Sequence, residues 1–171
     1  KADSREDDEL EAEPTADDIK VTSLQEMAGE APVVRLVHSI FAQGVREGAS
    51  DIHVSPQKDN IQIRFRIDGK LYEVPSPPKS LFLPIAARIK ILANMDITIS
   101  RLPQDGRFTL RVDKKEINVR ISSMPTIYGE NIVLRLLDMS AGIYTLDKLG
   151  MFNDDVQKIA QMAQKPYGMI L

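Results

Sequence analysis

Cysteine and tryptophan are both absent from the 171 residues of the chain. Without cysteine, disulfides and thiolate metal sites within these residues are excluded, which suits a reducing cytosol. Only 5% of the residues are aromatic, so isoleucine, leucine and valine must supply the core. No apolar run approaches the roughly 20 residues that a membrane-spanning helix needs, and no signal-peptide pattern is present.

Charge is distributed unevenly along the chain. Residues 1–20 contain nine acidic and three basic residues, whereas the net charge of the whole chain is −3. The remainder is therefore mildly basic, well short of the charge of a general nucleic-acid-binding domain. An acidic segment with few apolar residues is typical of a solvated linker, so residues 1–20 are predicted to be an acidic flexible linker.

Hydrophobic periodicity predicts an α+β fold. Apolar residues recur at helical spacing in 31–48, 80–95 and 153–164. Apolar and polar residues alternate in 51–54, 61–67, 70–74, 107–112 and 116–121, and 131–137 reads as a nearly continuous apolar strand. These patterns predict a mostly antiparallel sheet of about six strands, with helices packed on one face. Residues 168–171 resemble the start of a further, buried strand.

The stretch 101–107, RLPQDGR, is predicted to be a rigid loop. Pro103 has a fixed φ angle, and Asp105-Gly106 is a turn-forming pair. Such a loop would hold Arg107 at the start of the following strand.

Arginines gather on one face of the predicted sheet. Those on the polar phases of their strands are Arg64, Arg66, Arg107, Arg111 and Arg120. Ordinary solvent exposure is enough to explain the first two and Arg111. Arg135 differs because Val133 and Leu137 share its face, which predicts a partly buried guanidinium in need of a carboxylate or an anion. Several arginines on one face also suit bidentate recognition of phosphate.

Three other residues have side chains suited to catalysis or metal binding. Asp51 and His53 share a strand face, but His38 is the only other histidine, so no metal-ligand set is evident and structural roles are expected. Glu130 is either a catalytic carboxylate or an ion-pair partner of one of the arginines. The sequence contains no nucleophile elbow, Gly-rich phosphate loop or pair of catalytic carboxylates.

A basic sheet face is also compatible with binding of single-stranded nucleic acid, which needs exposed aromatic rings for base stacking. Phe65 and Phe108 lie on the apolar phase of their strands, while Tyr72 and Tyr128 occupy hairpin or turn positions. The stacking platform is therefore missing. A stand-alone PAS-like or single-stranded nucleic-acid-binding module remains the alternative function.

The order of the motifs resembles that of the type II secretion and type IV pilus assembly ATPases, hexameric motors of the bacterial secretion ATPase superfamily. The resemblance covers residues 30–171 and favours the pilus motor over the secretion motor. The motifs are EGASDIHVSP (47–56), IRFRIDGKLYEV (63–74), RLPQDGR (101–107), NVRISSMPTIYGENIVLRLLD (118–138) and LGM…KPYGMIL (149–171).

The resemblance implies a domain organisation. Residues 21–145 would form a PAS-like N-terminal domain, and 146–171 would be a linker, a helix and the first strand leading into a RecA-like ATPase domain. Both ends of the sequence look cut, and we expect it to stop just before the Walker A loop of that domain. ATP and Mg²⁺ would be bound mainly by the absent domain, where a zinc site is also possible.

The resemblance further implies roles for three arginines. Arg120 and Arg135 would reach from the sheet toward the γ-phosphate of ATP bound on the core domain, and Arg107 would belong to the same interdomain face. No catalytic or metal-binding residue is expected within this segment, which alone should be inactive although the parent protein hydrolyses ATP.

The implied partners are those of a molecular motor. The parent protein would be a homo-hexamer located in the cytoplasm, peripherally at the bacterial inner membrane. It would contact an inner-membrane platform protein and the assembly machinery, and no nucleic acid.

Overall fold

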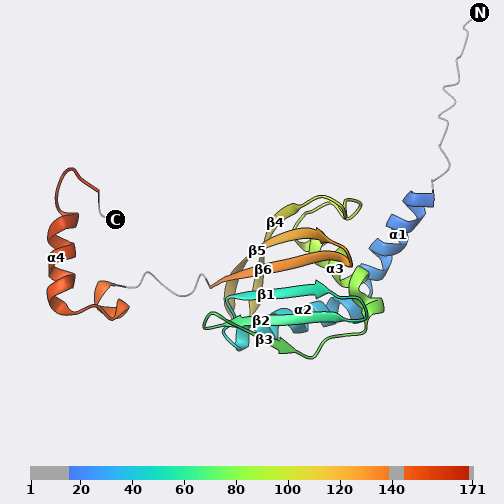
Figure 1. The fold of residues 1–171 in the computed structure, drawn as a ribbon, viewed down its shortest axis with the longest axis horizontal. Coiled ribbons are helices and arrows are strands. Elements are labelled where there is room, and N and C mark those ends of the chain that lie inside the picture. The colour runs from blue at the N-terminus through green and yellow to red at the C-terminus, as the bar shows by residue number, and fades with distance from the viewer. Residues whose placement is uncertain (1–15, 139–144, 170–171) are drawn as a thin grey trace, which may run out of the picture.

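The computed structural model describes residues 16–138 and 145–169. Six strands form one sheet in the order β3-β2-β1-β6-β5-β4 (Figure 1), and every neighbouring pair is antiparallel. The strands are β1 (Asp51–Pro56), β2 (Ile61–Ile67), β3 (Lys70–Val74), β4 (Gln104–Val112), β5 (Lys115–Thr126) and β6 (Gly129–Asp138). The predicted α+β fold with a six-stranded antiparallel sheet is confirmed.

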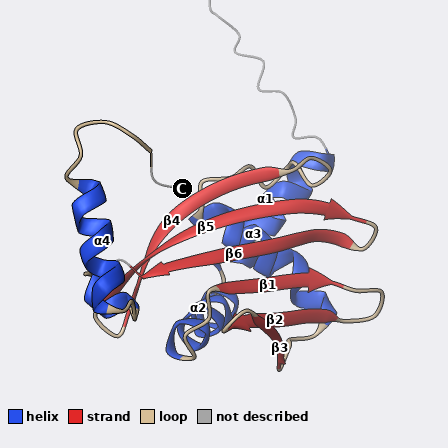
Figure 2. Ribbon diagram, turned by 60° about the vertical axis from the view of Figure 1, so that its left-hand side comes forward, coloured by secondary structure: helices blue, strands red, loops and turns tan. Residues whose placement is uncertain are grey.

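Helices cover one face of this sheet (Figure 2). The described residues form the helices α1 (Ala16–Gly29), α2 (Ala31–Arg46), α3 (Phe82–Leu92) and α4 (Asn153–Ala163) and the short 3₁₀ turns η1 (Lys79–Leu81) and η2 (Leu146–Leu149). The helices that lie against the sheet are α2 and α3. α2 contacts β1, α3 contacts β4, and α1 packs against α3. None of the helices α1, α2 and α3 lies on the opposite face, which is called the open face below. Within the described ranges, no helix is both long and apolar enough to cross a bilayer.

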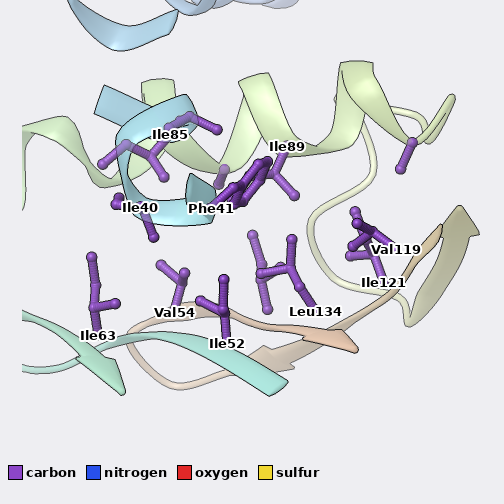
Figure 3. Close-up of a cluster of buried hydrophobic side chains, with 14 of the residues drawn as sticks. Ile40, Phe41, Ile52, Val54, Ile63, Ile85, Ile89, Val119, Ile121 and Leu134 are labelled. Carbon is purple, nitrogen blue, oxygen red and sulfur yellow. The ribbon is translucent and has the colours of Figure 1, made fainter. Parts of the chain in front are cut away.

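The core lies between the helices and the sheet (Figure 3). Each strand contributes alternate residues to it, because successive side chains of a strand point to opposite faces. Side chains that meet there and are less than 10% exposed include Phe41, Ile52, Val54, Ile63, Ile85, Ile89 and Leu134. Burying a side chain of this size stabilises the fold by about 1.5–3 kcal/mol. Alternation then places the residues between them on the open face.

α2 packs closely on β1. Pro32 suits the first turn of the helix, where its missing N–H costs nothing. A Cβ at Gly44 would lie only 2.7 Å from Cδ1 of Ile52. Glycine therefore lets the helix approach the strand, and a side chain at this position would require the buried Ile52 side chain to shift.

β4 begins earlier than the sequence predicts. Asp105 and Gly106 are strand residues paired with β5, so the prediction that they form a turn is wrong. A Cβ at Gly106 would lie 2.8 Å from both the Cβ and the carbonyl oxygen of Ala93. This glycine is required because the strand passes against the end of α3, not because the chain turns.

The sequence pattern also does not predict α1, which begins inside the expected linker 1–20. Apolar residues do not recur at helical spacing along α1, and its stability comes from packing on α3, where Ala28 is fully buried. Residues 1–15 lie outside the described residues. Gly168 and Met169 belong to no strand, and 170–171, the rest of the predicted buried strand, are not described.

A buried ion pair links α3 to β6. Nζ of Lys90 lies 2.5 Å from a carboxylate oxygen of Glu130, and the two side chains are 2% and 9% exposed. Ser123 donates a hydrogen bond to the same oxygen at 2.8 Å, and Lys90 also donates to the carbonyl of Ile99 at 2.7 Å. Glu130 therefore faces the helices and pairs with a core lysine, so the prediction that it pairs with an arginine is wrong.

Replacing Glu130 should destabilise the fold strongly. Glu130→Ala leaves the Lys90 ammonium buried without its counterion, which should lower the free energy of unfolding by about 3–5 kcal/mol. Urea unfolding of the chain followed by circular dichroism measures this loss. Glu116→Ala is the control, because the Arg111–Glu116 pair is mostly exposed and should contribute less than about 1 kcal/mol. Equal losses in the two variants would contradict the assignment.

Candidate functional site

A row of charged side chains crosses the open face over five adjacent strands. Arg66 of β2 is paired in register with Asp51 of β1, and Asp51 is paired with Arg135 of β6. Arg135 is paired with Arg120 of β5, and Arg120 with Arg107 of β4. Directly paired residues lie on the same face of a sheet. We call these five residues the arginine row.

Asp51 is the single carboxylate of the arginine row. Its Oδ1 accepts a hydrogen bond from Nε of Arg135 at 3.1 Å, and its Oδ2 lies 3.3 Å from Nε of Arg66. The hydroxyl of Ser50 donates to Oδ2 at 2.8 Å. Burial acts to raise the pKa of Asp51, but the hydrogen bonds from Ser50 and Arg135 and the charges of both arginines outweigh it and lower that pKa. Asp51 is therefore ionised at neutral pH.

Arg135 is more exposed than its apolar neighbours predict. Its side chain is 68% exposed, so the prediction of a partly buried guanidinium is wrong. The reason is that Val133 and Leu137 themselves lie on the open face. Arg135 bonds Asp51 through Nε, and no described residue accepts a hydrogen bond from its two terminal nitrogens. Those two nitrogens are therefore available to a ligand.

The structure brings the three predicted arginines onto adjacent strands. Arg120 and Arg135 line one shallow pocket of about 230 Å³ on the open face. Arg107 and Arg120 together line two neighbouring hollows of about 580 and 380 Å³. Neither Arg107 nor Arg120 forms an ion pair within the described part of the chain.

Three guanidinium groups on neighbouring strands repel one another, because strands lie only about 4.8 Å apart. Asp51 pairs with Arg66 and Arg135 at one end of the arginine row. Arg120 and Arg107 form no ion pair within the described residues, although the exposed carboxylate of Asp105 lines the same hollows. An anion with several oxygens would relieve this repulsion and accept bidentate hydrogen bonds from planar guanidiniums. The arrangement therefore suits an anion with several oxygens, such as a phosphate group.

His53 lies beside the arginine row, on the same face as Asp51 and paired in register with Arg64. Its Nε2 and the Nε of Arg64 are buried and have no hydrogen-bond partner among the described residues. Burial lowers the pKa of His53, and the charges of Arg66 and Arg64 lower it further, against the smaller opposing effect of Asp51. His53 is therefore neutral at pH 7. In the described part of the chain, no three acidic or histidine side chains come close enough to hold a metal ion.

None of the six strands places an aromatic ring on the open face. Phe65 is fully buried on the helix side, Tyr72 is its register partner, and the ring centroids of Phe108 and Phe41 are 5.7 Å apart. Base stacking has no platform here, so the alternative of single-stranded nucleic-acid binding is not supported.

Sequence reasoning missed the contact of Asp51 with the arginines. The alternation of residues 51–54 places Asp51 on the polar phase, but it does not reveal that β6 is a neighbour of β1. A usable signal was present, since a carboxylate in an apolar strand needs a cationic partner and this chain places arginines on the same phase of several strands.

Comparison with known proteins gives consistent matches. A family model described as "Type II/IV secretion system protein" matches residues 26–171. The chain is 41% identical over 157 residues to "Type II secretion system protein E" of Xanthomonas campestris, a match that covers 92% of this chain and 27% of that protein. It is 40% identical over 163 residues to the Pseudomonas aeruginosa protein of the same name, covering 95% and 32%.

A pilus protein matches equally well. "Type IV pilus assembly ATPase PilB" of Myxococcus xanthus is 43% identical over 164 residues, covering 91% of this chain and 29% of that protein. The chain thus spans about a third of the length of the curated relatives it matches.

His53 should make the stability of the chain depend on pH. Because its pKa is lowered in the folded state, the unfolded chain binds more protons below its ordinary pKa of about 6.5. The free energy of unfolding should therefore fall as the pH decreases below about 6.5, by no more than about 1.4 kcal/mol per pH unit. Urea unfolding between pH 7.5 and 5.5 measures the slope.

His53→Gln should flatten this slope, whereas His38→Gln, at an exposed position of α2, should leave it in place. An unchanged slope in His53→Gln would show that the imidazole is equally easy to protonate in the folded and unfolded chains.

Proposed function

The chain belongs to the type II/IV secretion system protein family, and from this premise we propose that it is the N-terminal nucleotide-sensing and coupling domain of a hexameric motor ATPase. The motor would power type IV pilus assembly or type II protein secretion. Relatives named as a type II secretion system ATPase and a type IV pilus assembly ATPase support this role. They are about three times as long as the match, which leaves room for a separate nucleotide-binding core domain.

The arginine row is the observation that carries the proposal. Arg120 and Arg135 would contact the γ-phosphate of ATP held by the core domain, and Arg107 would lie on the same interdomain face. Their guanidiniums stand on neighbouring strands, two of them without an ion pair within the described residues. A planar fork can bind two phosphate oxygens at once, and its charge matches the charge that develops on the transferred group.

The same contacts would couple nucleotide state to domain position. With ATP present, the arginines would favour closure of this domain on the core, and loss of the γ-phosphate would release it. ATP and Mg²⁺ would be held mainly by the core domain, where a zinc site is also possible. We assign residues 21–145 to a PAS-like domain and 146–171 to the linker, helix and first strand of the core.

In a homo-hexameric ring, closure of this domain on the core in one subunit after another would then do mechanical work. The partners would be an inner-membrane platform protein and the assembly machinery, and the motor would work in the cytoplasm, peripherally at the inner membrane. Nucleic acid is not among the proposed partners, because none of the six described strands carries an aromatic ring on the open face for base stacking.

Removing either arginine should slow ATP hydrolysis by the full-length motor. Losing one charge-assisted contact to the transition state costs about 2–4 kcal/mol, so Arg120→Ala and Arg135→Ala should each lower the rate roughly 30- to 1,000-fold. Lysine should substitute poorly because it keeps the charge but loses the planar fork. Steady-state hydrolysis is the measurement, after circular dichroism and hexamer assembly have been checked.

Arg111→Ala is the matched control for both substitutions. Arg111 lies on the open face of β4 but outside the arginine row, and its side chain is 83% exposed beside Glu116. It should leave hydrolysis close to the parent rate. If Arg120→Ala and Arg135→Ala assemble normally and also hydrolyse ATP at the parent rate, these arginines are only solvated surface residues and the proposal is wrong.

The isolated chain should neither hydrolyse ATP nor bind it tightly. Two or three arginines on an open face provide screened charge and little else, so we expect a dissociation constant no tighter than roughly 1 mM. Isothermal titration calorimetry of the 171-residue chain with ATP tests this expectation. Micromolar binding would show that the site does not depend on a core domain.

A further inference from the structure

We propose that Asp51 is a positioning residue that fixes Arg135 in the orientation in which its terminal nitrogens can bind phosphate. This inference rests on the proposed function, because it assigns Arg135 the same anion. It concerns a different residue, however, and a contact that lies beneath the proposed phosphate-binding surface rather than on it.

The contact with Asp51 does not use the two terminal nitrogens of Arg135. Asp51 accepts its hydrogen bond from Nε, the nitrogen nearest the backbone, at 3.1 Å. The two terminal NH₂ groups stay unbonded among the described residues and form the fork that recognises phosphate. The Asp51 side chain is 8% exposed, whereas that of Arg135 is 68% exposed. The carboxylate therefore holds the arginine from below and is shielded from an arriving anion.

Asp51 is itself held rigidly. Ser50 donates to its Oδ2 at 2.8 Å, and Arg66 lies 3.3 Å from the same oxygen. The backbone of Ser50 is fixed on both sides, since its N–H donates to the carbonyl of Arg66 at 2.8 Å and its carbonyl accepts from the N–H of Leu136 at 2.9 Å. Asp51, which holds Arg135, thus follows a residue whose backbone is hydrogen-bonded to both β2 and β6.

This arrangement reduces the cost of binding an anion. An arginine side chain has many rotamers, and ordering it when a ligand arrives costs conformational entropy. A contact that orders the side chain beforehand removes part of that cost, which is the advantage of preorganisation. Arg120 has no such contact within the described residues, so of the two arginines assigned to the γ-phosphate only Arg135 is preordered by a carboxylate.

The test is a double-mutant cycle on ATP hydrolysis by the full-length motor. Asp51→Ala should lower the rate on the order of 10-fold in the parent and have almost no further effect in the Arg135→Ala background, because residues that act through one contact are not additive. Asp51→Asn keeps an oxygen that can accept from Nε, so it should retain more activity than Asp51→Ala.

Two further variants complete the cycle. Glu116→Ala is the matched control, because it also breaks a cross-strand arginine–carboxylate pair on the open face but should not change the rate. Ser50→Ala removes the hydroxyl that holds Asp51 and should give a smaller loss, again absent in the Arg135→Ala background. If Asp51→Ala does not assemble, Asp51→Asn and Ser50→Ala can each be combined with Arg135→Ala in the same double-mutant cycle.

The outcomes separate the two proposals. Equal losses from Asp51→Ala in the parent and in the Arg135→Ala background would show that Asp51 acts on the fold in general, and would overturn the positioning role. A large loss in Arg135→Ala together with the parent rate in Asp51→Ala would overturn the positioning role alone. The parent rate in Arg135→Ala would overturn the proposed function, and the role of Asp51 with it.

Discussion

The pairing of β1 with β6 is the constraint on which the open face depends. These two strands are far apart in the sequence, and their register sets Asp51 opposite Arg135. The side-chain period of a strand is two residues, so a slip of one residue would turn Arg135 toward the core and Leu134 toward solvent. The hydrophobic core therefore enforces the register, and the register in turn aligns the arginine row.

The arginine row is unfavourable by itself. Like charges that face each other on neighbouring strands destabilise a sheet, and Asp51 compensates only the pair on either side of it. The chain tolerates this repulsion because the opposite face of the same strands buries isoleucine, valine and leucine side chains against α2 and α3. Like charges retained side by side on one face, although they destabilise the sheet, are characteristic of a surface kept for binding.

Sequence patterns were sufficient for features that depend on neighbours in the chain. Alternation in 61–67 and 116–121 located two of the strands and placed Arg66 and Arg120 on the polar phase. Sequence patterns did not predict the features that depend on pairing between strands distant in the chain. The exposure of Arg135 was mispredicted because alternation breaks down in a strand whose open face also carries Val133 and Leu137. α1 was missed because its stability comes from packing on α3 and not from its own pattern.

β6 connects the two faces of the sheet. Glu130 near its start points to the helices and pairs with Lys90 of α3, while Arg135 points to the open face and pairs with Asp51. The odd spacing of five residues between them places the two side chains on opposite faces. A strand held by ion pairs on both faces cannot shift its register without breaking one of them, and breaking the buried pair is costly. A displacement applied at the arginines would therefore move the sheet and α3 together, as the proposed coupling role requires.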